Sequence, residues 1–187
     1  MIADRQLTME FEHRSSQSGE DFLVADCNNE AIDWIDIWPN WPAPALVIVG
    51  AAGAGKSHLA AVFAAHSGAQ FINANEFSSI ASDVANDLII EDVDRILSSE
   101  LEQPLLHVYN SAKEASHRIL MTAATPPARW GITLPDLRSR MNTAISVEIG
   151  PPEDTLITAL LVKMFADRQV QVSSDVITYA ASRMERS

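Results

Sequence analysis

Residues 45–63, ALVIVGAAGAGKSHLAAVF, contain the most informative pattern in the chain. Residues 45–50 are apolar and rich in valine and isoleucine, which predicts a strand buried on both faces of a parallel sheet. Residues 50–57 match the pattern G-x-x-x-x-G-K-[ST], and residues 56–66 predict a helix. A strand, a glycine-rich turn and a helix in this order indicate a P-loop.

The chemistry of a P-loop explains the residue types in this motif. Glycines let the backbone fold so that its N–H groups point at phosphate oxygens, and the positive end of the following helix faces the same anion. Lys56 is expected to reach the β- and γ-phosphates, and the Ser57 hydroxyl to coordinate Mg²⁺. The alternative is a chance turn rich in glycine and alanine. The predicted cofactors are Mg²⁺ with ATP or ADP, and the predicted nucleotide-binding residues are Gly50, Gly53, Ala54, Gly55, Lys56, Ser57 and His58.

A P-loop needs an acidic partner for Mg²⁺, and residues 88–92, LIIED, supply one. This segment predicts a strand that ends in the carboxylates of Glu91 and Asp92. One carboxylate would hold the metal and the other would orient the attacking water, but the sequence leaves open which does which. The alternative is a strand that simply ends in solvated acids. The predicted metal site is therefore Ser57, Glu91 and Asp92, with both carboxylates as catalytic residues.

Other apolar segments predict the remaining strands of the sheet. They span residues 69–74, 87–92, 117–123 and 144–150. A helix is predicted from Ser99 to about Ser116, because Ser99 with Glu102 three residues later matches a capping box. Five strands that alternate with helices predict an α/β domain with a parallel sheet over residues 22–150.

Two segments flank this domain. Residues 1–21 are mostly polar and predict a flexible arm, which contains one apolar alternation at Leu7, Met9 and Phe11. Residues 151–187 have apolar side chains at helical spacing and predict a second, helical unit. Its last predicted helix reaches almost to the end of the chain, so this unit is expected to be short or incomplete.

Composition excludes several classes of function. A net charge of −12 makes the chain a poor candidate for gripping a DNA backbone by itself, because that requires clustered lysine and arginine. The single cysteine, Cys27, allows no disulfide within the chain and suits a reducing compartment. The N-terminus lacks the apolar core of a signal peptide, and no stretch approaches the ~18 apolar residues of a membrane span. We therefore expect a cytoplasmic protein that binds neither DNA nor a membrane directly.

Four segments narrow the class of P-loop protein. They are GKSHLAAVF at 55–63, LHVYN at 106–110, TAATPP at 122–127 and LPDLRSR at 134–140. In this order they resemble the AAA+ ATPases related to the bacterial initiator DnaA, and above all the shorter, Hda-like members of that group. The P-loop occurs in many families, whereas the other three segments are more specific. The resemblance extends from about Phe22 to the end of the chain.

This resemblance implies a five-stranded parallel sheet of order 5-1-4-3-2, followed after residue 150 by a helical lid. It also implies that Arg140 is an arginine finger, which reaches the nucleotide of a neighbouring AAA+ subunit. A planar and permanently charged guanidinium suits the charge at a γ-phosphate. Without the resemblance, Arg140 would be interpreted as an exposed arginine in a polar turn. Leu23 and Asn29 lie where the family contacts adenine.

The arm also resembles a family feature. Residues 6–11, QLTMEF, are similar to the hexapeptide by which Hda-like proteins bind the bacterial sliding clamp. In such an extended peptide, Gln6 would hydrogen-bond at the rim of a pocket, and Leu7, Met9 and Phe11 would fill an apolar groove. The alternative is an edge strand, or an arm that packs on its own core.

Three features depart from the family pattern. Ala124 stands where an acidic residue usually follows the fourth strand, so a polar sensor beside the γ-phosphate would be missing unless Thr122 substitutes for it. Glu91 replaces the usual aspartate, and the lid ends before an arginine that often contacts nucleotide. These departures favour nucleotide binding with weak or no intrinsic hydrolysis.

The resemblance implies a negative regulator of chromosome replication initiation. Held on the sliding clamp by residues 6–11, the protein would present Arg140 to ATP on DnaA and promote hydrolysis there. The clamp and DnaA are its expected partners, and it could also form homo-oligomers. Two alternatives stay open: a self-contained ATPase of the helicase-loader type, and a nucleotide-independent clamp-binding scaffold with a relic P-loop. The preference between ATP and ADP also stays open.

Overall fold

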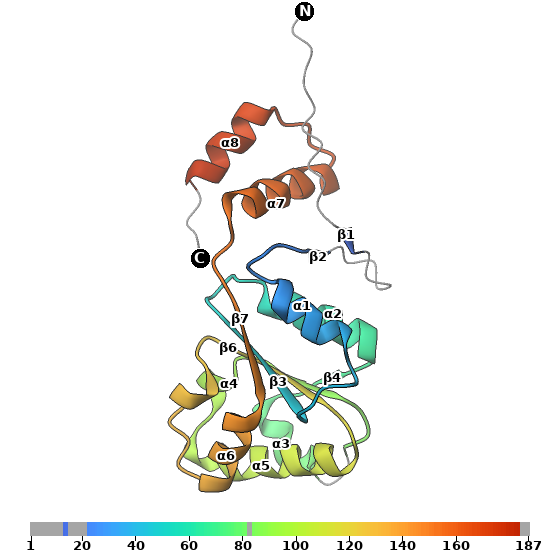
Figure 1. The fold of residues 1–187 in the computed structure, drawn as a ribbon, viewed down its shortest axis with the longest axis vertical. Helices are drawn as coiled ribbons and strands as arrows, with labels where there is room; N and C mark the ends of the chain where they lie inside the picture. The colour runs from blue at the N-terminus through green and yellow to red at the C-terminus, as the bar shows by residue number, and fades with distance from the viewer. Residues whose placement is uncertain (1–12, 15–21, 82–83, 184–187) are drawn as a thin grey trace, which may run out of the picture.

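The computed structural model describes residues 13–14, 22–81 and 84–183. A central sheet lies between two layers of helices, and a pair of helices, α7 and α8, lies at one end of the molecule (Figure 1). The described part of the chain contains no helix that is both long enough and apolar enough to cross a membrane.

Five parallel strands form the sheet, in the order β4-β5-β6-β3-β7. Their bounds are Ala45–Gly50 for β3, Gln70–Phe71 for β4, Leu88–Ile90 for β5, Ile119–Ala123 for β6 and Ile145–Ile149 for β7. Counted along the chain and from the β7 edge, this order is 5-1-4-3-2, which confirms the predicted topology. The strand predicted over 69–74 shortens to two residues at the edge of the sheet, where only β5 offers a partner.

Strand β3, which lies between β6 and β7, divides the core into two halves. All six of its residues are buried, as the apolar run predicted. Ala45, Val47 and Val49 belong to one apolar cluster, and Leu46 and Ile48 to the other. Because successive side chains of a strand point to opposite faces, this one strand supports the helices on both sides of the sheet.

The first face is covered by α1 (Asn29–Asp36) and α2 (Lys56–Ser67). The ring of Trp41 stacks on that of Phe63 in α2, with centroids 5.3 Å apart, and its indole N–H donates to the Trp34 carbonyl oxygen. These aromatic contacts fix α1 against α2, so that both helices meet the sheet as one layer.

Other helices cover the second face of the sheet. They are α3 (Phe77–Ile80), α4 (Val93–Ile96), α5 (Ser99–Glu114) and α6 (Pro135–Thr143), with 3₁₀ turns η1 (Ala74–Glu76) and η2 (Pro127–Arg129). The long helix α5 buries an apolar stripe, including Leu105, Val108 and Ala112, under the strands. This spacing of three and four residues is that of an amphipathic helix against a core.

The helical unit after residue 150 consists of α7 (Asp154–Asp167) and α8 (Ser174–Arg183). Leu156 and Ile157, near the start of α7, are buried. Further along, Val162, Val176 and Tyr179 are about half exposed or more. The unit therefore contacts the main domain through the first turn of α7.

Two short strands precede the main domain. β1 (His13–Arg14) pairs in antiparallel fashion with β2 (Phe22–Leu23). The other residues of the predicted arm, 1–12 and 15–21, lie outside the described residues. The proposed clamp-binding residues Gln6, Leu7, Met9 and Phe11 are among them.

Glu102 has a different partner from the one predicted. Helix α5 begins at Ser99, and the residue before it, Ser98, caps no N–H of this described helix with its side chain. Instead, Glu102 is 5% exposed and accepts hydrogen bonds from the Thr133 N–H (2.9 Å), the Thr133 hydroxyl (2.8 Å) and the Leu134 N–H (2.6 Å). The predicted capping box is therefore wrong, because three donors in the loop before α6 attract the carboxylate away from its own helix.

We expect Glu102→Gln to lower the free energy of unfolding at neutral pH by about 1–3 kcal/mol, because an amide nitrogen would face donors of Thr133 and Leu134. These hydrogen bonds, first among them the one from the Thr133 N–H, hold the pKa of Glu102 below its ordinary value in the folded protein. The stabilisation is therefore complete above the pKa of the unfolded chain, and it is lost as the pH falls through the lower pKa of the folded protein.

Urea unfolding of both proteins between about pH 7 and pH 3 tests this expectation. The difference in unfolding free energy between wild type and Glu102→Gln should shrink as the pH falls. Glu100→Gln, which changes an exposed carboxylate in the same first turn, should unfold like the wild type. A difference of constant size across the range would contradict the assignment.

Candidate functional site

The glycine-rich turn connects the buried strand β3 to helix α2. Gly53 has φ 80° and Gly55 has φ 92°, both in the left-handed region where a side chain is strained. Gly50 has a different constraint: a Cβ there would lie 3.2 Å from the Ala54 Cβ and 3.2 Å from the Ile149 carbonyl oxygen. The spacing of the glycines in the motif therefore follows from backbone conformation at two positions and from close packing at the third.

The turn ends at the N-terminus of α2, where an anion would be stabilised. Gly55 precedes the helix and has no side chain with which to cap it, and uncapped N–H groups at a helix N-terminus suit an anion. The Lys56 ammonium donates to the carbonyl oxygens of Gly50 and Ala51, each at 2.9 Å. Lys56 is 8% exposed, so the loop encloses a cation with one further N–H to donate.

The register of the sheet brings the acidic pair to this loop. Val49 of β3 pairs with Ala123 of β6, and Ile90 of β5 pairs with Met121 of the same strand. The residues after each strand therefore meet at one edge of the sheet, with Gly50 beside position 124 and Glu91 beside position 122. Because all these strands are parallel, the P-loop and the predicted metal-binding carboxylates share the carboxyl edge.

Glu91 and Asp92 differ in their surroundings. The Glu91 Oε1 atom is buried and has no hydrogen-bond partner among the described residues. The Asp92 carboxylate instead lies 3.6 Å from the Arg95 guanidinium, and 46% of its side chain is exposed. The Asp92 backbone has φ 50°, and its N–H donates to the Thr122 hydroxyl oxygen at 3.0 Å. Glu91 thus offers an inward, unsatisfied oxygen, whereas Asp92 is engaged at the surface.

The side-chain oxygens of Glu91 and Ser57 are suitable ligands for an Mg²⁺ ion that also coordinates a phosphate. Within the described ranges, no three His, Cys, Asp or Glu side chains gather as a metal cage. Mg²⁺ is usually bound by one or two carboxylates together with substrate phosphates and water, so such a cage is not required. The buried Glu91 oxygen needs a cation or a donor, and Ser57 in the first turn of α2 adds a hydroxyl.

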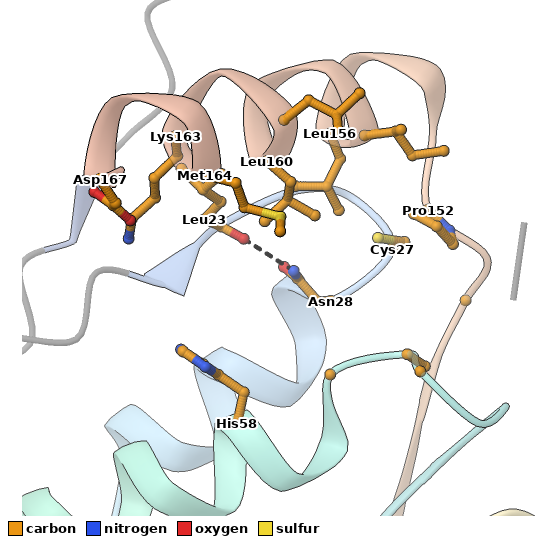
Figure 2. A pocket seen from close by; sticks show the side chains of 16 residues that line it. Leu23, Cys27, Asn28, His58, Pro152, Leu156, Leu160, Lys163, Met164 and Asp167 are labelled. Atoms are coloured by element: carbon orange, nitrogen blue, oxygen red, sulfur yellow. Dashed lines mark hydrogen bonds between the residues drawn. The ribbon is translucent and has the colours of Figure 1, made fainter. Parts of the chain in front are cut away.

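A cavity of about 520 Å³ lies between the P-loop and α7. Figure 2 shows Leu156, Leu160 and Met164 of α7 on one side, Leu23 and Asn28 opposite them, and His58 pointing in from α2. Gly53 and Gly55 of the P-loop also line it, so the cavity continues directly from the phosphate-binding turn. Its mostly apolar walls suit a flat, uncharged group attached to a phosphate chain.

The polar residue on the cavity floor is held rigidly. Asn28 is 5% exposed, and its side chain accepts from the Ala25 N–H at 2.9 Å and donates to the Leu23 carbonyl oxygen at 3.0 Å (Figure 2). Leu23 was expected at the base-binding position and lines the cavity, whereas Asn29 is not among the described lining residues. Cys27 also lines it, and burial raises the pKa of its thiol.

The family resemblance implied a helical lid after residue 150, but it named no residue of α7 at the nucleotide site. The sequence does contain a signal for this role. Leu160 and Met164 are apolar but remain partly exposed on α7, as expected of residues that line a binding site. Which surface these residues would meet could not be read from the spacing, because it depends on the direction in which the chain leaves β7.

Arg140 lies near the amino ends of the strands, on the side of the sheet opposite the P-loop. It is exposed in the last turn of α6, at the end of the molecule opposite α7 and α8 (Figure 1). β7 follows α6 and runs from there to the edge that contains the P-loop; its five residues span ~16 Å. This is longer than an arginine side chain, so the structure does not bring Arg140 to the P-loop of its own chain. Arg140 lies near the buried Tyr109, whose pKa is raised by burial and lowered in part by this charge.

Comparison with known proteins adds to this geometry. No family model matches the chain. The chain is similar to the chromosomal replication initiator protein DnaA of Cutibacterium acnes, with 25% identity over 163 residues, which covers 75% of this chain and 33% of that protein. It is also similar to DnaA of Corynebacterium jeikeium, with 27% identity over 195 residues, covering 90% of this chain and 33% of that protein. The chain therefore spans about a third of the length of the curated relatives it matches.

Solved structures share the fold. The crystal structure of a DNA replication initiation factor matches with a TM-score of 0.76 and 16% identity, covering 88% of this chain and 59% of that chain. Domain III of the Thermotoga maritima replication initiation protein DnaA matches with a TM-score of 0.70 and 18% identity, covering 86% and 78%. A structure of DnaA from Aquifex aeolicus bound to AMPPCP matches with a TM-score of 0.71 and 16% identity, covering 88% and 59%.

The sequence and structure comparisons agree on one relationship. The alignments with the two DnaA sequences named above cover 75% and 90% of this chain, and domain III of DnaA has the same fold. The sheet order expected of an AAA+ core is also the observed one. The chain is therefore homologous to the AAA+ domain of the chromosomal replication initiator protein DnaA.

Proposed function

We propose that this protein binds ATP or ADP together with Mg²⁺ and regulates the initiation of chromosome replication. The buried Lys56 ammonium supports this proposal most directly, because it lies at the same edge of the sheet as the N-terminus of α2 and the buried carboxylate oxygen of Glu91. The phosphate chain would lie in the loop, and the base would enter the apolar cavity under α7. DnaA structures bound to AMPPCP have the same fold.

In this arrangement the residues of the phosphate end have separate tasks. Ser57 and Glu91 would hold Mg²⁺, which neutralises charge on the β- and γ-phosphate oxygens. Asp92 would orient water at the surface side of the same edge, where its carboxylate is half exposed. Thr122 already accepts the Asp92 N–H, and no acidic side chain follows at position 124, so intrinsic turnover is expected to be weak.

The regulatory part of the proposal concerns Arg140 and the arm. Arg140 is exposed and separated from the P-loop of its own chain by the length of β7. A guanidinium in that position is suited to a nucleotide on another molecule, and the homology to DnaA suggests ATP bound by DnaA. Residues 6–11 would hold the protein on the sliding clamp.

A second candidate is a self-contained ATPase of the helicase-loader type. The presence of two carboxylates, Glu91 and Asp92, after β5 favours it, because one can hold Mg²⁺ while the other orients water. The two candidates differ in one property: the regulator needs a partner for hydrolysis, whereas the ATPase turns over alone.

Titration of the purified protein with ATP and ADP plus Mg²⁺, with and without the sliding clamp, tests the nucleotide site. We expect binding of both nucleotides with negligible turnover, and at least a ~10-fold loss of affinity in Lys56→Ala, because the charge at the phosphates is removed. Lys113→Ala, an exposed lysine on α5, should bind like the wild type. Brisk turnover by the protein alone would favour the second candidate, and no binding of either nucleotide would overturn the proposal.

Arg140→Ala tests the action on a partner. We expect this variant to bind nucleotide like the wild type but to lose most of the stimulation of ATP hydrolysis by DnaA, measured as phosphate release in a mixture with the clamp on DNA. Arg138→Ala is the matched control, since it removes a second exposed arginine from the same helix. Equal effects of the two substitutions would show that bulk positive charge, and not a finger, is responsible.

Leu7→Ala combined with Phe11→Ala tests the arm. We expect clamp binding to fall by ~10-fold or more in a surface-binding assay, because two apolar anchors are removed. Nucleotide affinity should not change. Ser15→Ala combined with Ser16→Ala alters the same arm outside the hexapeptide and should bind the clamp normally. Unchanged clamp binding by the Leu7/Phe11 variant would show that residues 6–11 do not bind the sliding clamp.

A further inference from the structure

The segment after β6 is fastened by a residue that the family resemblance does not single out. Asp94 lies in the single turn of α4, two residues beyond the acidic pair. Its Oδ2 atom accepts three hydrogen bonds, from the Ala124 N–H, the Thr125 N–H and the Thr125 hydroxyl, each at 3.0 Å. One carboxylate oxygen therefore holds two consecutive residues that are 30 and 31 positions away in the chain.

The hydrogen bonds of Asp94 lie next to the P-loop. Val49 pairs with Ala123, so position 124 borders Gly50, where the P-loop begins. Ser57 and Glu91 would hold Mg²⁺ together with the phosphates, so the strand end that contains Glu91 is expected to lie toward the γ-phosphate. Asp94 would then fix the backbone at the side of the loop where ATP and ADP differ.

The second oxygen of the same carboxylate is unsatisfied. Asp94 Oδ1 is buried and has no hydrogen-bond partner among the described residues. A buried anionic oxygen without a partner is costly, and the three hydrogen bonds that Oδ2 accepts offset part of this cost. The situation of Asp94 Oδ1 resembles that of Glu91 Oε1 at the same strand end, which also awaits a donor or a cation.

We propose that Asp94 is a positioning residue for the γ-phosphate side of the nucleotide site. It supplies from α4 the carboxylate that position 124 lacks, and it acts by fixing the Ala124–Thr125 backbone rather than by touching the nucleotide. The inference rests on the proposed function, since it assumes that a nucleotide occupies the P-loop. It goes beyond that function by naming the residue that makes the site distinguish a triphosphate from a diphosphate.

The hold on the loop is tested first, in nucleotide-free protein. Asp94→Ala should speed hydrogen exchange of the Ala124 and Thr125 amides by about tenfold, because both lose their acceptor. The Gly150 amide, which donates to Cys27 across a different part of the fold, should exchange as in the wild type. Asp94→Asn retains one carbonyl oxygen as acceptor and should restore most of the protection.

The effect on nucleotide is tested by equilibrium binding of AMPPCP and of ADP, both with Mg²⁺. Asp94→Ala should weaken AMPPCP about tenfold and leave ADP within about twofold, so the ratio of the two affinities falls. Thr125→Val removes one of the three donors and should have a smaller effect on this ratio. Glu114→Ala, an exposed carboxylate on α5, is the matched control and should leave both affinities unchanged.

The outcomes separate this inference from the proposed function. Equal weakening of AMPPCP and ADP, or unchanged exchange at Ala124 and Thr125, would overturn the role of Asp94 while the nucleotide site stands. If wild-type protein bound neither nucleotide, both the proposed function and the positioning role would fail, whatever the exchange data show. A lower affinity ratio in Asp94→Ala, recovered in Asp94→Asn, would support the inference, because loss of folding alone would not change the ratio.

Discussion

The parallel register of β3 with its two neighbours, β6 and β7, organises this molecule. Residues 45–50 pair with β6 on one side and β7 on the other, which fixes the register of β3 between these two strands. The buried side chains of β3 pack against helices on both faces of the sheet. Because the strands run in one direction, the turns after them meet at one edge. The P-loop follows β3, the acidic pair follows β5, and the segment held by Asp94 follows β6, which pairs with both of these strands. The three segments are therefore neighbours, although 30 or more residues separate them along the chain.

The electrostatic potential at the carboxyl edge depends on the charged groups closest to it rather than on the net charge of the chain. The chain has a net charge of −12, yet the phosphate loop encloses Lys56 and ends at the positive pole of α2. Two buried carboxylate oxygens nearby, on Glu91 and Asp94, remain unsatisfied within the described structure. Such a site has little to gain from an anion without a cation, which agrees with a nucleotide that arrives together with Mg²⁺.

Opposite edges of the sheet serve different purposes in the proposed function. The carboxyl edge would receive the nucleotide, with the cavity under α7 for the base. The other edge presents Arg140 on α6, which the Glu102 carboxylate helps to position by holding the loop before that helix. Under the proposed function, the molecule would bind one nucleotide at the carboxyl edge and act through Arg140 on the nucleotide of a partner.

Local patterns were enough to predict the strands, the glycine-rich turn between β3 and α2, the place of Glu91 and Asp92 after β5 and, with the family resemblance, the sheet order. Strand burial and glycine conformation are properties of neighbouring residues, so the sequence reports them directly. The partner of Glu102 was predicted wrongly, whereas the hydrogen bonds of Asp94 and the α7 residues that line the cavity were not predicted. Each of these joins residues that lie about 30 or more positions apart, so no spacing along the chain reports them. Only the folded chain decides which donors face a carboxylate, since a side chain takes the strongest partner that packing brings within hydrogen-bond distance.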